Sequence, residues 1–356
     1  MKIKTSFSNI IISTDIQSVI KKFMDKSDYS KIFILVDENT QKHCIPVIKK
    51  NDLFDDVNII ETKSGESNKS IKTVTKIWEY LTQHNADRNA LLINLGGGII
   101  GDMGGFAAST FKRGMDFVNI PTTLLSQVDA SVGGKTGINF LNLKNEIGVF
   151  NHPKNVFIDS RFLKTLDKRN ILSGWAEMIK HTLIFNQQDF EHLTQNNIAN
   201  INHKTLNQLI ARSVKIKNHY VESDPLEKGM RKALNFGHTL GHAFESFFMD
   251  QKPNLLHGEA VALGMICELY LSNKLCNFPI QKMHQIINYV LNTYSKINIP
   301  EKDMDTIIEL IGHDKKNKGL NINFTLLEDF GKIKINQHCN KADILETLRW
   351  YNTLQR

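Results

Sequence analysis

Apolar runs separated by helix-like segments restrict the fold of this chain more than any other feature of its sequence. Lys31–Val36, Val57–Glu61 and Ala90–Leu95 each have the length and the aliphatic content of a buried strand. A helical pattern over Lys69–Gln83 lies between the last two, and Asn155–Asp159 is predicted as a further strand. Because buried strands that alternate with helices are typical of a parallel sheet, we predict an α/β first half.

The pattern changes at about residue 167, where almost continuous helical periodicity begins. One strand-like piece, Leu320–Leu327, interrupts it. A chain of 356 residues is long enough for two domains with separate cores. We therefore expect an α/β domain over residues 1–167 and a helical domain over residues 168–356.

A glycine-rich turn follows the third predicted strand, with the sequence Leu95–Gly–Gly–Gly–Ile–Ile–Gly–Asp102. Without Cβ atoms, the backbone N–H groups of such a turn can approach a pyrophosphate at the positive end of a helix. The spacing differs from the G-x-G-x-x-G fingerprint, so a tight turn without a ligand is the alternative. We favour a dinucleotide site.

Polar residues near other predicted strands fit a nucleotide site as well. Asp37 directly follows a strand, where a carboxylate can accept hydrogen bonds from a ribose, although Asp is also a common turn residue there. The loop Ser64–Glu66 with Lys69 adds an acceptor and a cation at the same predicted sheet edge. Gly134–Lys135–Thr136 imitates a phosphate-binding loop, but Asp129 stands where that motif requires glycine, so we reject a P-loop.

The stretch Arg231–His242 carries the second set of functional candidates. His238 and His242 are four residues apart, which places both imidazoles on one face of a helix. A glycine precedes each histidine, which admits another backbone or a ligand and costs roughly 1 kcal/mol of helix propensity each. We predict that Arg231 and Asn235 lie one turn upstream on the same helix, where they suit an anion. A packed helix with two partly exposed histidines is the alternative.

A histidine-plus-carboxylate set suits a divalent metal ion with an open position for substrate. The residues alone do not choose among the candidate ligands, which are Glu177, His181, His238, His242 and His257.

Charge and composition exclude several classes of protein. The net charge is +7, but the lysines are spread along the chain without interleaved aromatic residues, so we expect no nucleic-acid partner. We find no apolar run of membrane-spanning length and no signal peptide, and expect a cytoplasmic protein without a membrane partner. The four cysteines are scattered, which indicates neither a disulfide framework nor a zinc ribbon. A small anionic substrate explains the local cations better.

In their order along the chain, the motifs resemble those of the 3-dehydroquinate synthase family. The resemblance covers nearly the whole length and is carried by Ser64–Glu66, Gly96–Asp102, Arg113–Gly114, Ile120–Leu125, Val128–Lys135, Ser173–Lys180, Asn235–His242 and Leu256–Glu259. It implies a Rossmann-like NAD-binding α/β domain followed by an all-α metal-binding domain, and a homodimer.

The resemblance also assigns residues. It implies Glu177, His238 and His257 as ligands of a divalent metal, Zn or Co, so that His242 becomes a substrate-binding or proton-transfer residue beside the metal. Glu227 matches a second proton acceptor, and Arg113 matches a residue that comes from the partner subunit. The implied substrate contacts are Asp129, Lys135, Asn145, Lys180, Lys217, Arg231, Asn235 and one of Lys315 or Lys316. The implied NAD-binding residues are Asp37, Glu66, Lys69, Gly97, Gly98, Ile99, Gly101, Asp102, Thr122, Thr123, Lys135, Lys144, Phe162 and Thr165.

The implied reaction converts 3-deoxy-D-arabino-heptulosonate 7-phosphate, an anionic sugar phosphate, to 3-dehydroquinate and phosphate in the shikimate pathway of aromatic amino acid biosynthesis. It passes through transient oxidation by NAD, phosphate elimination, re-reduction and aldol closure, and the enzyme is a carbon–oxygen lyase. Three alternatives stay open: a sibling cyclase that makes 2-deoxy-scyllo-inosose or valiolone, a metal-dependent polyol dehydrogenase, and a nucleotide-binding module without activity.

Overall fold

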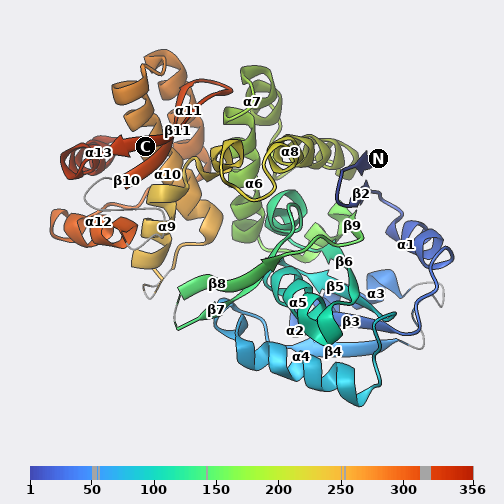
Figure 1. Ribbon diagram of the computed structural model, residues 1–356. Coiled ribbons are helices and arrows are strands. Elements are labelled where there is room, and N and C mark those ends of the chain that lie inside the picture. Colours follow the sequence, from blue (N-terminus) through green and yellow to red (C-terminus); the bar gives the residue numbers. More distant parts are fainter. Residues whose placement is uncertain are drawn as a thin grey trace. The chain divides into compact units, whose positions relative to one another are not determined.

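The computed structural model describes residues 1–49, 54, 57–141, 143–249, 251, 254–312 and 322–355 (Figure 1). The chain forms two compact units, which are Met1–Gly174 with Ile201–Asn218 and Trp175–Asn200 with His219–Arg356. The division falls within two helices, α6 (Lys168–Leu183) and α8 (His203–Ser223). The predicted domain limit between residues 167 and 168 is kept as a proposal.

A seven-stranded sheet of order β1-β2-β9-β6-β5-β3-β4 forms the centre of the first unit (Figure 1). Its strands are β1 (Lys2–Lys4), β2 (Asn9–Ile12), β3 (Ile32–Asp37), β4 (Asn58–Thr62), β5 (Leu91–Gly96), β6 (Asp116–Pro121) and β9 (Asn155–Ile158). The pairs are parallel except for β1 with β2, which confirms the predicted α/β class. The four predicted strands are β3, β4, β5 and β9. The sequence did not reveal β6, because Asp116 and Asn119 divide its apolar residues.

Helices cover both faces of this sheet. Phe33 and Leu35 face a core shared with α4 (Ile71–Gln83) and α5 (Gly98–Thr110). The alternate residues of the same strand, Ile34 and Val36, face a second core on the opposite side of the sheet, which is shared with two other helices. These are α1 (Ile16–Met24) and α3 (Ile45–Ile48), while α2 (Glu38–His43) directly follows β3. The period of two along β3 thus separates two apolar layers.

The strand order reverses at β3. The chain passes from β3 to β4 on one side and then to β5 on the other, and β3 pairs with both. In open α/β sheets, ligands bind beyond the carboxyl ends of the strands at such a switch point. Asp37 ends β3 and the glycine-rich turn follows β5, so both predicted nucleotide-binding elements lie at this point.

A two-stranded hairpin, β7 (Lys135–Phe140) with β8 (Leu143–Phe150), also belongs to the first unit. Gly133 and Gly134, with φ of 107° and 69°, turn the chain into it. Lys135, Lys144 and Asn145 therefore lie on strands, which the sequence analysis did not predict. Most of β8 is exposed, so the sequence carries no alternation that would reveal it.

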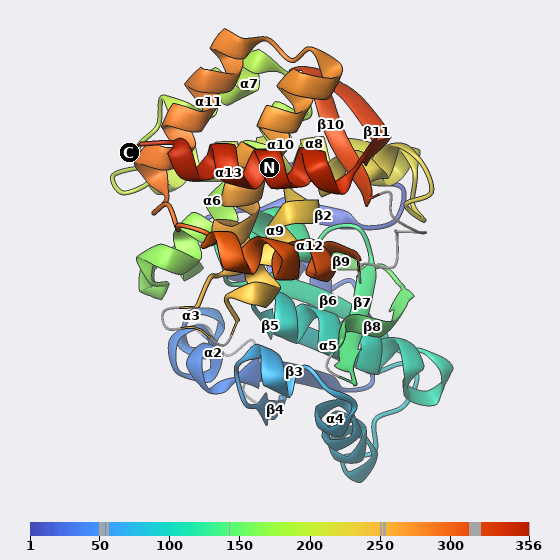
Figure 2. The same ribbon diagram turned by 90° about the vertical axis from the view of Figure 1, so that its left-hand side faces the viewer.

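Helices and one hairpin make up the second unit. Besides the parts of α6 and α8 that belong to it, the elements are α7 (Gln187–Thr194), α9 (His238–Phe247), α10 (His257–Cys276), α11 (Ile280–Thr293), α12 (Met304–Gly312), β10 (Ile322–Asp329), β11 (Lys332–Cys339) and α13 (Lys341–Thr353). The buried helix α10 lies at the centre and packs against α9, α11, α13 and β10 (Figure 2). The predicted strand-like piece is β10, and its partner β11 was not predicted.

Short 3₁₀ or π turns connect these elements. They are η1 (Glu66–Asn68), η2 (Phe111–Arg113), η3 (Ser126–Ala130), η4 (Ser160–Thr165), η5 (Met230–Asn235) and η6 (Glu301–Asp303). Among the residues that the structure describes, none of the helices combines the length and the apolar character needed to cross a bilayer.

The predicted continuous helix over Arg231–His242 is wrong in its first half. Arg231 and Asn235 lie on the 3₁₀ segment η5, and α9 begins only at His238. The reason is Gly237, whose φ of 80° is incompatible with a right-handed helix. His238 and His242 do share α9, as predicted.

The packing of α5 against the sheet yields a prediction for stability. A Cβ atom at Gly104 would lie 1.9 Å from Oδ1 of the buried Asn94, whereas one at Gly101 on the same helix would meet nothing within 4 Å. We expect Gly104→Ala to lower the free energy of unfolding by about 1–3 kcal/mol through overpacking. Gly101→Ala is the matched control and should raise it by about 0.5–1 kcal/mol. Urea unfolding measures both, and equal midpoints for the two variants would contradict the prediction.

Candidate functional site

Three side chains from three helices meet at one carboxylate oxygen in the second unit. Glu177 lies on α6 and is fully buried, while His238 and His257 are the first residues of α9 and α10. The Nε2 atoms of His238 and His257 lie 3.4 Å and 3.6 Å from Oε1 of Glu177. The fold thus brings together the ligand set that the family resemblance implied.

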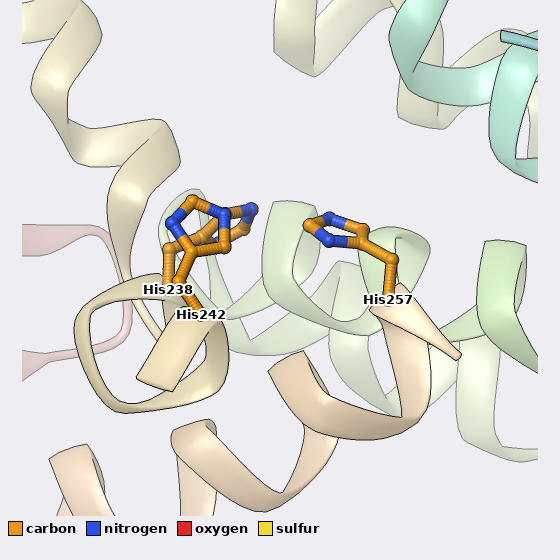
Figure 3. A group of neighbouring side chains, drawn as sticks. All are labelled: His238, His242 and His257. Carbon is orange, nitrogen blue, oxygen red and sulfur yellow. The ribbon is translucent and has the colours of Figure 1, made fainter. Parts of the chain in front are cut away.

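His242 lies beside this group. Its ring centroid is 5.3 Å from that of His238 and 5.6 Å from that of His257, and the three side chains offer nitrogen atoms within 4.8 Å of one another (Figure 3). His242 is exposed, whereas Glu177 is completely buried. An exposed imidazole beside a buried ligand group is suited to proton exchange with solvent or substrate. His181, the remaining candidate, is buried on α6 and does not belong to the three-histidine group.

Hydrogen bonds fix which nitrogen of each imidazole is available. Nδ1 of His238 lies 3.0 Å from the carbonyl oxygen of Phe236, which only accepts, so Nδ1 carries the proton. Nδ1 of His257 lies 3.1 Å from Oε2 of Glu245 and donates in the same way. When neutral, each imidazole therefore offers its Nε2 atom to a cation beside Glu177, whereas without a cation a proton on Nε2 of His257 pairs with this carboxylate. This is the arrangement of outer partners usual for metal-bound histidine, and the donor set fits a divalent cation.

The carboxylates around His257 also favour the binding of a cation at this site. Burial disfavours the charged form of Glu177, but the Lys180 ammonium and His238 outweigh it and hold the pKa of Glu177 well below its usual range. Burial likewise disfavours the imidazolium of His257, but Glu177 and Glu245 raise its pKa to about 10. The two carboxylates therefore draw positive charge to this point, which a divalent ion supplies.

Other predicted residues of the second unit surround a tight turn. Asn235 donates from Nδ2 to Oε1 of Glu227 at 3.0 Å, and Glu227 has a positive φ of 58°. The buried Arg231 donates from Nη1 to the carbonyl oxygen of Pro225 at 2.6 Å. Asp224 accepts from the backbone N–H of Arg231 at 3.2 Å. Lys180 is buried and ion-paired with Glu177. Lys315 and Lys316 lie outside the described residues.

The glycine-rich turn in the first unit leaves backbone accessible at the switch point. Gly97 is the N-cap of α5 and offers no capping side chain, and Gly98 begins the helix. The open space beside Gly101 shows that packing does not require glycine there. A cavity of about 10 Å³ under the turn, lined by Gly97, Gly98, Gly101 and Asn94, has room for one water molecule. A Cβ atom at Gly97 or Gly98 would lie 3.2 Å from Thr123 or Ala130, so close packing favours glycine at these two positions, whereas a ligand that approaches the backbone is the better explanation for Gly101.

Charged residues predicted for the nucleotide are already engaged with each other. The buried Lys69 forms an ion pair of 2.5 Å with Oδ2 of Asp102, and it also donates to Asn145. Oδ1 of Asp37 accepts from the backbone N–H of Thr40 at 2.8 Å, so the turn role that we weighed for this residue is present.

The remaining nucleotide residues lie close to the same strands. Oε1 of Glu66 accepts from Asn139 at 2.8 Å, and Thr123 bonds Ser126 at 2.9 Å. Thr122 is buried directly after β6. Ile99, the second residue of α5, packs partly buried against the core, and Lys144 is exposed on β8.

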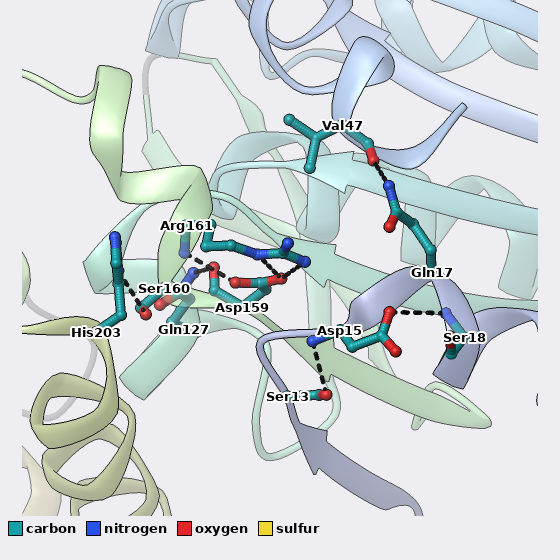
Figure 4. Close-up of polar contacts among 10 residues, drawn as sticks. All are labelled: Ser13, Asp15, Gln17, Ser18, Val47, Gln127, Asp159, Ser160, Arg161 and His203. Atoms are coloured by element: carbon teal, nitrogen blue, oxygen red, sulfur yellow. Dashed lines mark hydrogen bonds and ion pairs between the residues drawn. The ribbon is translucent and has the colours of Figure 1, made fainter. Parts of the chain in front are cut away.

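A polar network fixes the chain where it leaves β9 (Figure 4). Asp159 is fully buried and accepts from Nε and Nη2 of Arg161 at 2.8 Å and 2.6 Å. Gln127 donates to the carbonyl oxygen of Asp159 at 2.9 Å, and Ser160 bonds Nδ1 of His203 at 3.1 Å. These contacts position η4, which carries the predicted Phe162 and Thr165. Phe162 is a core residue, whereas Thr165 is exposed.

Three predicted substrate residues of the first unit differ in their surroundings. Lys217 forms an ion pair of 2.7 Å with Oδ1 of Asp129 and also donates to its carbonyl oxygen. Lys135 is exposed at the start of β7. Arg113 is exposed with a φ of 69°.

Sequence reasoning missed Glu245, which orients His257. His238, His242 and Glu245 are spaced i, i+4 and i+7, so the same helical face carries all three. This periodicity was a signal that pointed to Glu245.

The fold and the site define a class of enzyme with a nucleotide-binding α/β unit and a helical unit built around a histidine–carboxylate centre. Residues 59–173 match the family described as 3-dehydroquinate synthase N-terminal, and residues 174–317 match 3-dehydroquinate synthase C-terminal. The chain belongs to the 3-dehydroquinate synthase family.

Individual relatives agree with this membership. The chain is 49% identical to the 3-dehydroquinate synthase of Parabacteroides distasonis, over 97% of this chain and 98% of the relative. Among solved structures, it resembles a 2-deoxy-scyllo-inosose synthase in complex with carbaglucose-6-phosphate, NAD⁺ and Co²⁺ (TM-score 0.88, 25% identity, 98% of this chain and 99% of the other). It shares its fold with the 2-epi-5-epi-valiolone synthase of Streptomyces hygroscopicus, solved with NAD⁺ and Zn²⁺ (TM-score 0.85, 22% identity, 98% of each chain).

The geometry of the centre predicts the effect of removing one ligand. We expect His238→Ala to weaken metal binding by more than the roughly 10- to 100-fold that loss of an outer partner causes, and to abolish turnover. Metal content after dialysis and Co²⁺ titration of the metal-free protein measure the change. His284→Ala, an exposed histidine on α11, is the control and should bind metal like the unchanged protein. Full metal content in the His238 variant would refute the assignment.

Proposed function

We propose that this chain is a 3-dehydroquinate synthase, a carbon–oxygen lyase that converts 3-deoxy-D-arabino-heptulosonate 7-phosphate to 3-dehydroquinate and phosphate. The observation that carries the proposal is the meeting of Glu177, His238 and His257 at one point, in a chain that matches a synthase of this kind over 97% of its length. A 2-deoxy-scyllo-inosose synthase is the second candidate, because such an enzyme has nearly the same fold, but its identity is only 25% against 49% for the dehydroquinate synthase.

Two cofactors belong to the proposal. We place NAD at the switch point of the sheet, where the glycine-rich turn and Asp37 lie, and a divalent ion, Zn²⁺ or Co²⁺, between Glu177, His238 and His257. The relatives solved with NAD⁺ and with Co²⁺ or Zn²⁺ support both. When bound, NAD takes up and returns a hydride while the divalent ion polarises a substrate hydroxyl as a Lewis acid.

The residues of the chain then supply binding and proton transfer. His242 and Glu227 are the groups that take up and release the hydroxyl proton, because one is an exposed imidazole beside the centre and the other a carboxylate bonded to Asn235. The substrate has a phosphate and a carboxylate, and cations hold both ends. The proposed contacts are Asp129, Lys135, Asn145 and Lys217 in the first unit and Lys180, Arg231 and Asn235 in the second. Arg231 offers a bidentate fork, which a lysine lacks.

We further propose a homodimer in the cytoplasm. β8 exposes Leu143, Val149 and Phe150, an apolar strand surface typical of a protein interface. Arg113, exposed in a left-handed conformation, is the residue that we assign to the partner's site. All four cysteines are free and buried, which fits a reducing compartment.

Phosphate release tests the activity directly. We expect the heptulosonate phosphate to yield inorganic phosphate only when NAD⁺ and the divalent ion are both present, with no net NADH, because the hydride is returned. Omission of NAD⁺ or addition of a chelator should each stop the reaction. NADH that accumulates with turnover would indicate a polyol dehydrogenase instead. Phosphate release from glucose 6-phosphate alone would favour the inosose synthase.

Mixing two inactive variants tests the partner role of Arg113. A dimer of Arg113→Ala with His238→Ala contains one site that has both the metal ligand and the partner's arginine. Random assortment of equal amounts should therefore restore about one quarter of the sites, whereas each variant alone is inactive. Phosphate release after joint refolding or co-expression measures the recovery. A mixture that stays inactive, although native mass spectrometry shows mixed dimers, would contradict the role.

A further inference from the structure

Helix α9 begins at a residue that cannot cap it. Gly237, the N-cap, has a φ of 80°, and a Cβ atom there would lie 2.5 Å from Cγ of Met265. Helix N-termini leave backbone N–H groups without partners, and Ser, Thr, Asp or Asn normally supplies an acceptor from the N-cap itself. Glycine has no such side chain, so this end of α9 needs an acceptor from elsewhere.

Glu268 supplies that acceptor from the neighbouring helix α10. Its Oε2 accepts from the backbone N–H of Gly237 at 2.6 Å, and its Oε1 accepts from the backbone N–H of Leu240 at 3.2 Å. In a capping box, two side chains of one helix satisfy these same two positions, the N-cap and N3. Here one carboxylate from another helix satisfies both.

The position of Glu268 follows from the way in which α9 and α10 cross. A Cβ atom at Gly264 would lie 2.1 Å from the carbonyl oxygen of Gly237, so the two backbones are in contact. Gly264 and Glu268 are four residues apart and share one face of α10. The carboxylate therefore reaches the end of α9 just beyond the glycine contact. Glu268 is 0% exposed in an otherwise apolar stretch of α10, which is unusual for a carboxylate without a specific partner.

The capped turn carries a proposed metal ligand. His238 is the first residue of α9, directly between Gly237 and the residues that lead to Leu240, and its Nδ1 bonds the carbonyl oxygen of Phe236. Rotation of this turn would move Nε2 of His238 away from Oε1 of Glu177. The negative charge of Glu268 also offsets the positive end of the α9 dipole, which otherwise disfavours a cation beside it.

We propose that Glu268 is a positioning residue of the metal centre, which holds the first turn of α9 so that His238 points to the metal. This inference rests on the metal site proposed above and assigns it a residue that contacts neither metal nor substrate. Glu268 acts through the backbone of α9.

Titration of the metal-free protein with Co²⁺ tests the proposal, with the visible absorption bands of Co²⁺ and the dissociation constant as readouts. We expect Glu268→Ala to weaken Co²⁺ binding about 10- to 100-fold and to change the bands, because the ligand geometry changes. Glu268→Gln keeps one carbonyl acceptor and should show a smaller loss. If the alanine variant does not fold, the Co²⁺ dissociation constant and the absorption bands of Glu268→Gln test the proposal instead.

Ser272→Ala is the matched control. Ser272 lies one turn further along α10 and is equally buried. Its hydroxyl accepts from the backbone N–H of Leu327 at 3.0 Å and donates to the backbone carbonyl oxygen of Glu268 at 2.6 Å, so its removal leaves the Glu268 carboxylate in place. We expect this variant to lower the melting temperature while Co²⁺ affinity and bands stay unchanged. Unchanged affinity and bands in Glu268→Ala, or equal losses in Ser272→Ala, would overturn the proposal. Failure of the unchanged protein to bind Co²⁺ would instead remove the metal site itself.

Discussion

Contact between the backbones of α9 and α10 is the constraint on which the second unit depends. Gly237, Gly241 and Gly264 leave no room for a side chain between the two helices. The first residues of both helices are the histidines of the centre, so the crossing sets the distance between the imidazoles. A larger residue at any of these glycines would separate the helices and with them the ligands.

Electrostatic interactions stabilise the charged groups that the packing of the helices brings together. Glu177 is buried with no exposed surface, and a carboxylate remains charged in such a place only when cations surround it. Lys180, His238 and His257 provide that surrounding, and Glu245 fixes the tautomer of His257. The centre is therefore suited to exchange protons for a divalent ion, which is the requirement for a metal-dependent step on a hydroxylated substrate.

In the first unit, the important feature is a stretch of backbone that a ligand can approach. The strand order reverses at β3, which lies between β4 and β5. The glycine-rich turn begins α5 at this switch point. The network around Asp159 and Arg161 fixes the neighbouring exit from β9. Loops at this edge are thus held by buried polar contacts, which is usual where loops carry function on a rigid scaffold.

The sequence alone was enough to predict the class of fold, because β3, β5 and β9 consist of buried, mostly apolar residues and alternate along the chain with helical segments. It also determined the family, since glycine and histidine motifs with fixed spacing are local in the chain. The tertiary structure decided what depends on long-range contact. It placed the start of α9 at His238 instead of about two turns earlier at Arg231, because Gly237 has a positive φ where α9 crosses α10. It formed β7–β8 from exposed residues without an apolar pattern. It also brought Glu268 of α10 to the first turn of α9, because an acceptor from another helix carries no signal at the position that it serves.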